Sequence, residues 1–174
     1  MTTTYIGIDN GISGAIAILS PDNNVTLQLM PVYKTGTLSF IDELAVYDIL
    51  NSFKIKEENV HIIFEQGQKN PIFGTKGNFS NGYSFGVIHT ILKIVKVPFT
   101  LVNPQTWQKV MFKDIRGMKN KSNKNGKTTK DASIEVCKRL YPEQSLIPIK
   151  RSKKPHDGLA DALLMATYGK RENL

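Results

Sequence analysis

Short runs of apolar residues recur along the chain and predict β-strands at five places. These runs cover residues 5–8, 15–19, 25–29, 60–64 and 99–102. The first three are joined by short segments with turn signals, Asn10-Gly11 and then residues 21–24, so they predict an antiparallel meander. The fourth run is apolar almost throughout, which is typical of a strand that is buried on both faces.

Apolar positions at helical spacing predict five helices. These helices cover residues 40–52, 83–95, 104–112, 128–140 and 157–168. Ser39 is the expected cap of the first helix, Thr128 and Asp131 resemble a capping box, and Gly169 is the expected C-cap of the last. The order of elements predicts one α/β domain over residues 1–174, with a five-stranded mixed sheet and helices on both faces.

Two segments follow neither period. Residues 66–82 are rich in Gly, Asn, Lys and Phe, and we expect a long functional loop there. Residues 113–127 carry six Lys or Arg side chains against one acid, Asp114, with Asn, Ser and Gly between them. We expect this second segment to be a flexible basic loop.

The charge balance narrows the class of partner. The 174 residues include 23 Lys and Arg against 15 Asp and Glu, which gives a formal net charge of +8. This balance indicates a polyanionic partner, nucleic acid before an anionic membrane. The single cysteine, Cys137, excludes an internal disulfide and fits a reducing compartment. With no signal-peptide pattern and no apolar run of membrane-span length, we expect a cytoplasmic protein, with an organelle matrix left open, and no membrane partner.

Four acidic residues stand where chemistry is expected. Asp157 and Asp161 are four residues apart, so they share one face of the last predicted helix. Asp9 and Glu65 each end a predicted strand, and they would be adjacent if those strands were parallel neighbours. Four carboxylates at one place suit Mg²⁺ or Mn²⁺ rather than zinc, and they would support phosphodiester hydrolysis with two ions per site.

Each of these acids also has a simpler interpretation. Asp157 is in a position to cap its helix, and Asp9 is in a position to start the turn at Asn10-Gly11. Glu65 could pair with Lys69 in the segment that follows it. The sequence by itself leaves these alternatives open.

Three motifs around the acids resemble those of RuvC-type Holliday junction resolvases, which are ribonuclease-H-like endonucleases. The motifs are Tyr-Ile-Gly-Ile-Asp-Asn-Gly-Ile-Ser-Gly-Ala from residue 5, Ile-Ile-Phe-Glu-Gln from residue 62 and His-Asp-Gly-Leu-Ala-Asp-Ala-Leu-Leu from residue 156. Residues 102–107 and 128–133 also look like segments of RuvC-like proteins of phages and organelles. The resemblance extends from Tyr5 to about Tyr168.

The resemblance implies a ribonuclease-H-like fold and a crossover junction endodeoxyribonuclease of DNA recombination and repair. It implies a homodimer that cuts two strands of a four-way junction symmetrically with Mg²⁺, which Asp9, Glu65, Asp157 and Asp161 would bind. One feature departs from the bacterial pattern, which often places the last two acids three residues apart: here position 158 is glycine. His156 is a candidate hydrogen-bond donor to a metal ligand or a general acid/base, and a plain loop histidine is the alternative.

Aromatic and basic residues outside the motifs are candidate DNA contacts. The segment after Glu65 combines cations with aromatic rings that could stack on unpaired bases, namely Lys69, Phe73, Lys76 and Phe79. The remaining candidates are cations that would contact phosphates: Lys113, Arg116, Lys119, Lys121, Lys124, Lys127, Lys130, Lys150, Arg151, Lys153 and Lys154. The alternative is that the charges are simply solvated and that Phe79 and Phe85 pack beneath the loop, which leaves Phe73 as the expected exposed ring.

Other functional classes remain to be weighed against a nuclease. A binding-only module for branched DNA would have no use for four clustered acids. An ATPase of the actin and sugar-kinase type also has an Asp-x-Gly segment after its first strand, but it needs a second glycine-rich phosphate motif that this sequence lacks. Within the nuclease interpretation, strict four-way junctions and broader branched DNA are both open. An apolar stripe at Ile88, Ile91, Leu92 and Val95 would build the dimer interface by resemblance, and core packing is the alternative.

Overall fold

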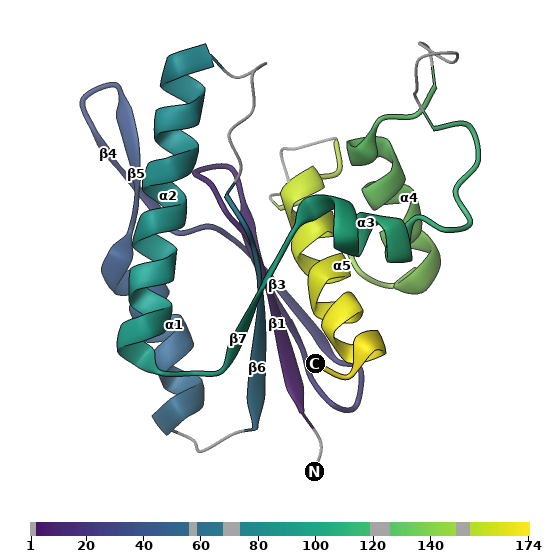
Figure 1. The fold of residues 1–174 in the computed structure, drawn as a ribbon, viewed down its shortest axis with the longest axis horizontal. Helices are drawn as coiled ribbons and strands as arrows, with labels where there is room; N and C mark the ends of the chain where they lie inside the picture. Colours follow the sequence, from purple (N-terminus) through teal and green to yellow (C-terminus); the bar gives the residue numbers. More distant parts are fainter. Residues whose placement is uncertain (1–2, 56–58, 68–73, 119–125, 149–153) are drawn as a thin grey trace.

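The computed structural model describes residues 3–55, 59–67, 74–118, 126–148 and 154–174. A five-stranded sheet lies at the centre, with the strand order β3-β2-β1-β6-β7 (Figure 1). Its strands are β1 (Thr4–Asp9), β2 (Ala15–Leu19), β3 (Val25–Leu29), β6 (Val60–Glu65) and β7 (Phe99–Val102). The first three pair antiparallel, whereas β6 is parallel to both β1 and β7. The predicted meander and the mixed sheet are therefore confirmed.

Helices cover both faces of the sheet, as predicted (Figure 1). One face carries α1 (Glu43–Ile55) and α2 (Gly74–Val95). The other carries α3 (Pro104–Met111), α4 (Thr129–Leu140) and α5 (Asp157–Glu172). Because side chains alternate across a strand, Ile62 of β6 packs with the first group of helices and Ile63 with the second.

The apolar stripe of α2 belongs to the core. Ile88, Ile91, Leu92 and Val95 are all buried and pack against β6 and α1 in one apolar cluster. Core packing is therefore the correct interpretation of these four positions. The side chains that α2 exposes are others, among them Phe79 and Ile94.

Helix α5 packs directly on β1 and on β6, and Gly7 of β1 and Gly169 of α5 make this close approach possible. A Cβ atom added at Gly7 of β1 would lie 1.9 Å from the backbone oxygen of Ala162. A Cβ atom at Gly169 of α5 would lie 2.6 Å from Cγ1 of Ile63. The prediction that Gly169 ends the helix is wrong: α5 continues to Glu172, and Asn173 takes the left-handed conformation (φ 52°) after it.

The predicted start of the first helix is also wrong. Residues Leu38–Ile41 form a strand, β5, which pairs with β4 (Val32–Thr35) in a separate two-stranded sheet. Phe40 stacks on Tyr33 across this hairpin, with ring centroids 5.6 Å apart, and this pairing competes successfully with the helical spacing of Phe40 and Leu44. Asp42, not Ser39, caps α1, because its Oδ1 accepts a hydrogen bond from the backbone N–H of Ala45 (3.0 Å).

The loop predicted at 66–82 is wrong over its second part. Helix α2 begins at Gly74, so residues 74–82 are helical despite three glycines and two asparagines. Residues 83–95 are anchored in the core, and adding turns to a formed helix costs less than starting one. Packing therefore overrides the poor helix propensity of this segment.

The remaining cap prediction, the capping box of α4, is confirmed, and α3 begins at residue 104 as predicted. Pro104 opens α3, and the Asn103 side chain accepts a hydrogen bond from the backbone N–H of Gln105 (2.9 Å). Thr128 and Asp131 form a reciprocal capping box at α4. In the predicted basic loop, Met118 and Lys127 form an isolated parallel bridge, and residues 119–125 lie outside the described part of the chain. Within the described residues, no helix has the length and apolar content needed to cross a membrane.

Candidate active site

Asp9 and Glu65 lie at the same edge of the sheet. Strands β1 and β6 are parallel neighbours, and their register pairs Ile8 with Phe64, so each acid directly follows a buried apolar residue. Both strands end at this edge of the sheet, so the polar side chains that follow them form a rim above the apolar core. The condition on which the sequence argument depended, parallel adjacent strands, is met.

Helix α5 brings two more carboxylates to this edge. Asp157 is its first residue and Asp161 lies one turn further, on the same face. All four acids line one pocket of about 910 Å³. The turns after β1 and β6 and the first turns of α2, α3 and α4 complete its wall. The lining residues from these segments are Asn10, Gly11, Ile12, Ser13, Gln66, Gly67, Gly77, Ser80, Asn81, Pro104, Gln105 and Lys130.

Asp9 is a buried acid surrounded by the other three carboxylates. Burial raises the pKa of its carboxyl well above the ordinary value, and the nearby carboxylates of Asp161, Glu65 and Asp157 raise it further. Lys130 acts in the opposite sense but does not reverse the shift. Asp9 is thus a desolvated acid among like charges, the situation that a bound cation relieves.

Asp161 shows the same effect with a partner of its own. Burial raises the pKa of its carboxyl to about 7, although a hydrogen bond from the Ser133 hydroxyl to Oδ1 opposes the shift. Ser133 lies fully buried on α4. The hydroxyl orients one carboxylate oxygen toward the protein, so the second oxygen can face the pocket.

Glu65 is oriented by a tryptophan. Burial raises the pKa of Glu65, while the indole Nε1–H of Trp107 donates a hydrogen bond to its Oε2 (2.9 Å) and lowers it. Trp107 lies on α3, and its side chain is fully buried. A rigid donor in a packed environment leaves Glu65 little freedom to rotate away from the pocket.

Asp157 is held by a lysine. The ammonium group of Lys130, on the first turn of α4, lies 2.5 Å from Oδ2 of Asp157. Partial burial would raise the pKa of Asp157, but the hydrogen bond and charge of Lys130 together lower it. The Lys130 pKa is raised, chiefly by the same hydrogen bond. Asp157 is therefore the acid that stays ionised most readily.

Gly158 accounts for the departure from the bacterial motif. A Cβ atom at this position would lie 2.9 Å from Oδ2 of Asp9 and 2.9 Å from the backbone oxygen of Ser13. Position 158 therefore faces the Asp9 carboxylate at close range, and only a hydrogen atom fits while α5 stays in place. The second acid of the helix is placed at Asp157 instead, beside Lys130.

His156 stands immediately before α5 as its N-cap residue. Its backbone N–H donates to the carbonyl of Leu146 (2.8 Å), and its buried Nδ1 has no hydrogen-bond partner within the described residues. The ring is absent from the pocket lining given above. A role for His156 in the chemistry stays a prediction.

The donor chemistry of the pocket fits hard divalent cations. Its lining contains carboxylate, amide, hydroxyl and carbonyl oxygens and, among described residues, no thiol or imidazole. Among the described residues, no three or more Asp, Glu, His or Cys side chains are arranged so that they could hold a metal ion together without moving. Three of the acids are instead engaged by Trp107, Lys130 and Ser133.

The predicted DNA contacts are dispersed around this pocket. Phe79 and Lys76 are exposed on the first turns of α2, so the idea that Phe79 packs beneath a loop is wrong. Phe85 does pack inward, stacked on Phe64 with ring centroids 5.1 Å apart. Eight predicted residues lie outside the described part: Lys69, Phe73, Lys119, Lys121, Lys124, Lys150, Arg151 and Lys153.

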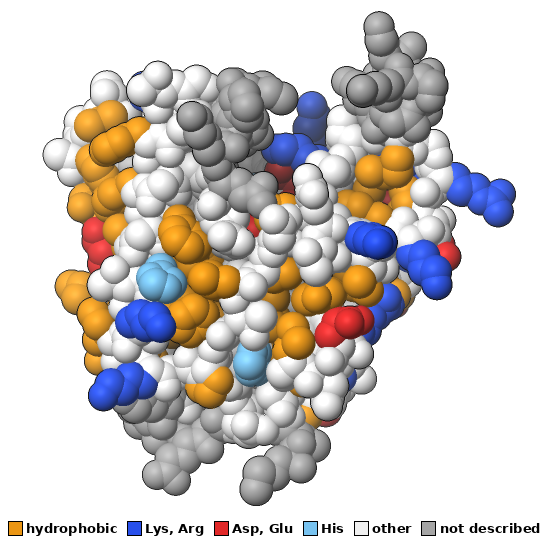
Figure 2. Space-filling view, in the orientation of Figure 1, with side chains coloured by type: hydrophobic (Ala, Val, Ile, Leu, Met, Phe, Trp, Pro, Cys, Tyr) orange, Lys and Arg blue, Asp and Glu red, His pale blue; other side chains and the backbone are white. Residues whose placement is uncertain are grey.

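The remaining predicted cations are on the surface. Lys113, Arg116 and Lys154 are exposed, and Lys127 pairs with Glu135 at 2.5 Å. Lys130 alone among these reaches into the acidic pocket. Lys and Arg side chains gather on the half of the molecule that carries α3 and α4, whereas apolar side chains gather over the β4–β5 hairpin and α2 (Figure 2).

Sequence reasoning missed Trp107 and Ser133. The sequence places Trp107 on the predicted helix 104–112, but it gives no sign of which carboxylate an indole N–H meets. Ser133 lies two residues after Asp131 of the capping box, on the buried side of α4. A serine on an otherwise apolar helix face was the signal that could have found it, because a buried hydroxyl needs a partner.

Comparison with known proteins identifies the fold. No family model and no curated protein sequence matches the chain. Thermus thermophilus RuvC in complex with a Holliday junction substrate has a TM-score of 0.57 and 14% identity, over 98% of this chain and 96% of that one. Another Thermus thermophilus RuvC structure gives 0.50 and 12%, over 98% and 96%.

The yeast mitochondrial Holliday junction resolvase Ydc2 is similar as well. Its TM-score is 0.53 at 17% identity, and the match covers 96% of this chain and 77% of that one. Identities this low carry information on the fold alone. The chain has the ribonuclease-H-like fold of these proteins, which confirms the predicted fold class.

Proposed function

We propose that this protein is a divalent-metal-dependent endonuclease that cuts branched DNA, with the four-way junction as its principal substrate. The observation that carries the proposal is the convergence of Asp9, Glu65, Asp157 and Asp161 on one pocket. They come from two parallel strand ends and a helix N-terminus in a ribonuclease-H-like fold. The likeness to resolvases at 17% identity or less supports the choice of substrate class without establishing it.

The four carboxylates would hold two Mg²⁺ ions, or Mn²⁺ in their place. When bound, these ions supply positive charge at the scissile phosphodiester and favour ionisation of the attacking water. The raised pKa values of Asp9 and Asp161 follow from burial and mutual repulsion, so cation binding and loss of their protons are coupled. Trp107 and Ser133 restrict which oxygens of Glu65 and Asp161 face the pocket.

Lys130 would contact the DNA phosphate as well as the carboxylate of Asp157. Its ammonium group keeps Asp157 ionised and gives the pocket a positive charge on the side of α4. A phosphodiester that enters the pocket presents a second anion to this lysine. Lys130 therefore can exchange part of its contact with Asp157 for a contact with the phosphate, which favours DNA entry among four negative groups.

Phe79 is in a suitable place to contact an unpaired base. Its side chain is 75% exposed, and its neighbours Ser80 and Asn81 line the acidic pocket. An exposed ring on the rim of a site for a polyanion fits base stacking, which contributes roughly 1–3 kcal/mol per base. The open centre of a four-way junction offers such bases, whereas a continuous duplex does not.

Symmetric cutting of a junction requires two active sites, so the proposal includes a homodimer. Leu44 of α1 is 76% exposed and Ile94 of α2 is 59% exposed. Large apolar side chains that face solvent on the two helices covering this side of the sheet favour an association surface there. Sedimentation measurements on the free protein and on the junction complex test this part of the proposal separately from cleavage.

The decisive experiment is cleavage of a panel of four-way junctions, forks, flaps and duplexes with Mg²⁺, with Mn²⁺ and with a chelator. We expect metal-dependent cutting of the branched substrates, and loss of cutting in Asp9→Asn and Asp161→Asn with junction binding retained in gel shifts. Asp48→Asn, on the exposed side of α1, is the matched control and should cut normally. Cleavage by Asp161→Asn at the wild-type rate would refute the proposal, and binding without cleavage by the wild type would indicate a binding-only module.

A further inference from the structure

Helix α3 exposes a polar and basic face beside the acidic pocket. Trp107 and Met111 turn inward and are buried, so the other faces of the helix carry its polar residues. The helix contains no Asp or Glu, and Gln105, Thr106 and Lys109 are exposed. Its surface composition is that of a helix which faces an anion, because its only charge is positive.

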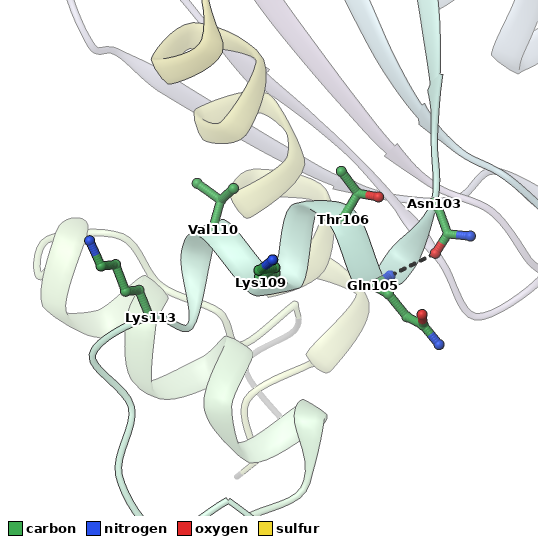
Figure 3. Close-up of a pocket in the computed structure, with 6 residues that line it drawn as sticks. All are labelled: Asn103, Gln105, Thr106, Lys109, Val110 and Lys113. Atoms are coloured by element: carbon green, nitrogen blue, oxygen red, sulfur yellow. Dashed lines mark hydrogen bonds between the residues drawn. The ribbon is translucent and has the colours of Figure 1, made fainter.

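A hollow of about 740 Å³ lies along this face (Figure 3). Asn103, Gln105, Thr106, Lys109, Val110 and Lys113 line it. Lys109 points out of the helix between Gln105 at one end and Lys113 at the other (Figure 3). At the rise of an α-helix, Gln105 and Lys109, which are four residues apart, are separated by about 6 Å along the helix axis, and Lys113 follows just after the end of α3.

The hollow adjoins the acidic pocket. Gln105 lines both, and Pro104 beside it lines the acidic pocket. Trp107, from the opposite face of the same helix, hydrogen-bonds Glu65. Helix α3 therefore connects the two regions: one face supports a catalytic carboxylate, and the other borders the surface that leads away from it.

The groups along this hollow are mainly hydrogen-bond donors and cations. Of the described residues that line it, none carries a carboxylate, and the neighbouring acid Asp114 lies just beyond Lys113. In the part of the chain that the structure describes, neither Lys109 nor Lys113 has an ion-pair partner. Two lysines that line one hollow and have no acidic partners complement a polyanion better than a single small anion.

We infer that the outward face of α3 is a phosphate-binding track, which holds the DNA strand that adjoins the scissile phosphodiester. Lys109 and Lys113 contact two successive phosphates, and the side-chain amides of Gln105 and Asn103 guide the strand toward the carboxylates. This inference rests on the proposed nuclease function and adds the direction in which the strand leaves the site. Lys113 was among the sequence-based candidates for phosphate contact, whereas Lys109 was absent from them.

The test is the salt dependence of junction binding. The Asp161→Asn protein, which is not expected to cut, serves as the parent, and the track variant adds Lys109→Gln and Lys113→Gln. Each phosphate contact contributes about 0.9 to the slope of log Kd against log salt concentration, so the double variant should lose about 2 from the slope. We expect junction affinity at physiological ionic strength to fall about tenfold.

The control is Lys138→Gln on the last turn of α4, which removes the same charge at the other end of the helix from Lys130. Its slope should stay within about 0.3 of the parent. In the cleaving protein, the track variant should raise KM with little change in kcat, because the lost contacts are remote from the reacting atoms. Thermal melting of each variant verifies that the fold is retained.

The outcomes separate the two proposals. If the parent binds junctions and the track variant keeps its slope and affinity, the track is refuted and the nuclease function stands. If Lys138→Gln lowers the slope as much as a track lysine does, the effect is general charge and the track is again refuted. If the parent binds no branched DNA, the proposed function itself fails, and the track fails with it.

Discussion

Trp107 is an aromatic core residue that also contacts the acidic pocket through Glu65. Its fully buried ring carries one polar atom, and that atom meets Glu65 at 2.9 Å. A partner that orients a metal ligand typically affects metal affinity or activity by about 10- to 100-fold. On the proposed function, the indole would act on the chemistry through Glu65, by fixing the orientation of its carboxylate.

Replacement of Trp107 by Phe separates orientation from packing. Trp107→Phe should raise the Mg²⁺ concentration for half-maximal cleavage by about tenfold, because Glu65 loses its fixed donor while most of the ring volume remains. Metal titration of cleavage rates measures this change. Met111→Leu, a buried neighbour on the same helix, is the packing control, and an equal shift in that variant would show that the effect is structural.

The raised pKa of Asp161 leads to a prediction about stability. Its folded-state pKa of about 7 lies above its ordinary value of 3.8, so this group stabilises the fold below pH 4 and that contribution is lost as the pH rises through 7. At pH 8 without metal, Asp161→Asn should therefore be more stable than the wild type, by roughly 2–4 kcal/mol in the free energy of unfolding. The difference should disappear toward pH 4.

Urea denaturation in the presence of a chelator, at pH 4 and pH 8, measures both proteins. Added Mg²⁺ should restore the wild type selectively, since the cation binds the folded carboxylates. A wild type that matches or exceeds the variant at pH 8 without metal would contradict the inferred cost of burying the charged Asp161 carboxylate among like charges.

At the scale of elements, the contact between α5 and β1 decides the geometry of the site. The Gly7 position leaves no space for a side chain, because a Cβ atom would lie 1.9 Å from the Ala162 carbonyl oxygen. Backbone cannot rotate away as a flexible side chain can, so the helix would have to move as a unit. That movement would separate Asp161 from Asp9.

Gly7→Ala should lower the free energy of unfolding by about 3 kcal/mol, because the extra methyl group forces the helix off the strand. Gly86→Ala is the matched control: it lies on the exposed side of α2, where an added Cβ has no atom within 4 Å. This control should raise stability by roughly 0.5–1 kcal/mol, since alanine is the better helix former. Urea midpoints measure both, and a Gly7→Ala protein as stable as the wild type would contradict the close packing.

At the scale of the whole molecule, elements with strong periodicity were predictable and those that depend on tertiary context were not. The sheet strands and the caps of α3 and α4 agree with the sequence pattern, because local chemistry and core packing favour the same structure there. The β4–β5 hairpin was missed, because Phe40 and Ile41 fit a helix as well as a strand until Tyr33 is placed opposite. The first turns of α2 were missed for the reverse reason, since their glycines oppose the helix that the core imposes.

At the site, too, the positions of the acids were predictable from the sequence and the partners of the acids were not. Strand-end and helix-face positions identified all four acids, because periodicity places a residue on an element without reference to its neighbours. The partners of those acids came from other elements: Trp107, Ser133 and Lys130 lie on α3 and α4. Contacts between elements far apart in sequence depend on how helices pack on the sheet, and a single sequence carries no pattern for that.

The wide separation of the acids along the chain has a consequence for the newly made protein. Asp9 and Asp161 are 152 positions apart (161 minus 9), yet α5 must lie on β1 before their carboxylates meet. While a ribosome is still synthesising the segment before α5, the nascent polypeptide has Asp9 and Glu65 without their helical counterparts. On the proposed function, such a chain cannot cut nucleic acid. Synthesis of the helix and its docking thus delay a hazardous activity until the molecule is folded.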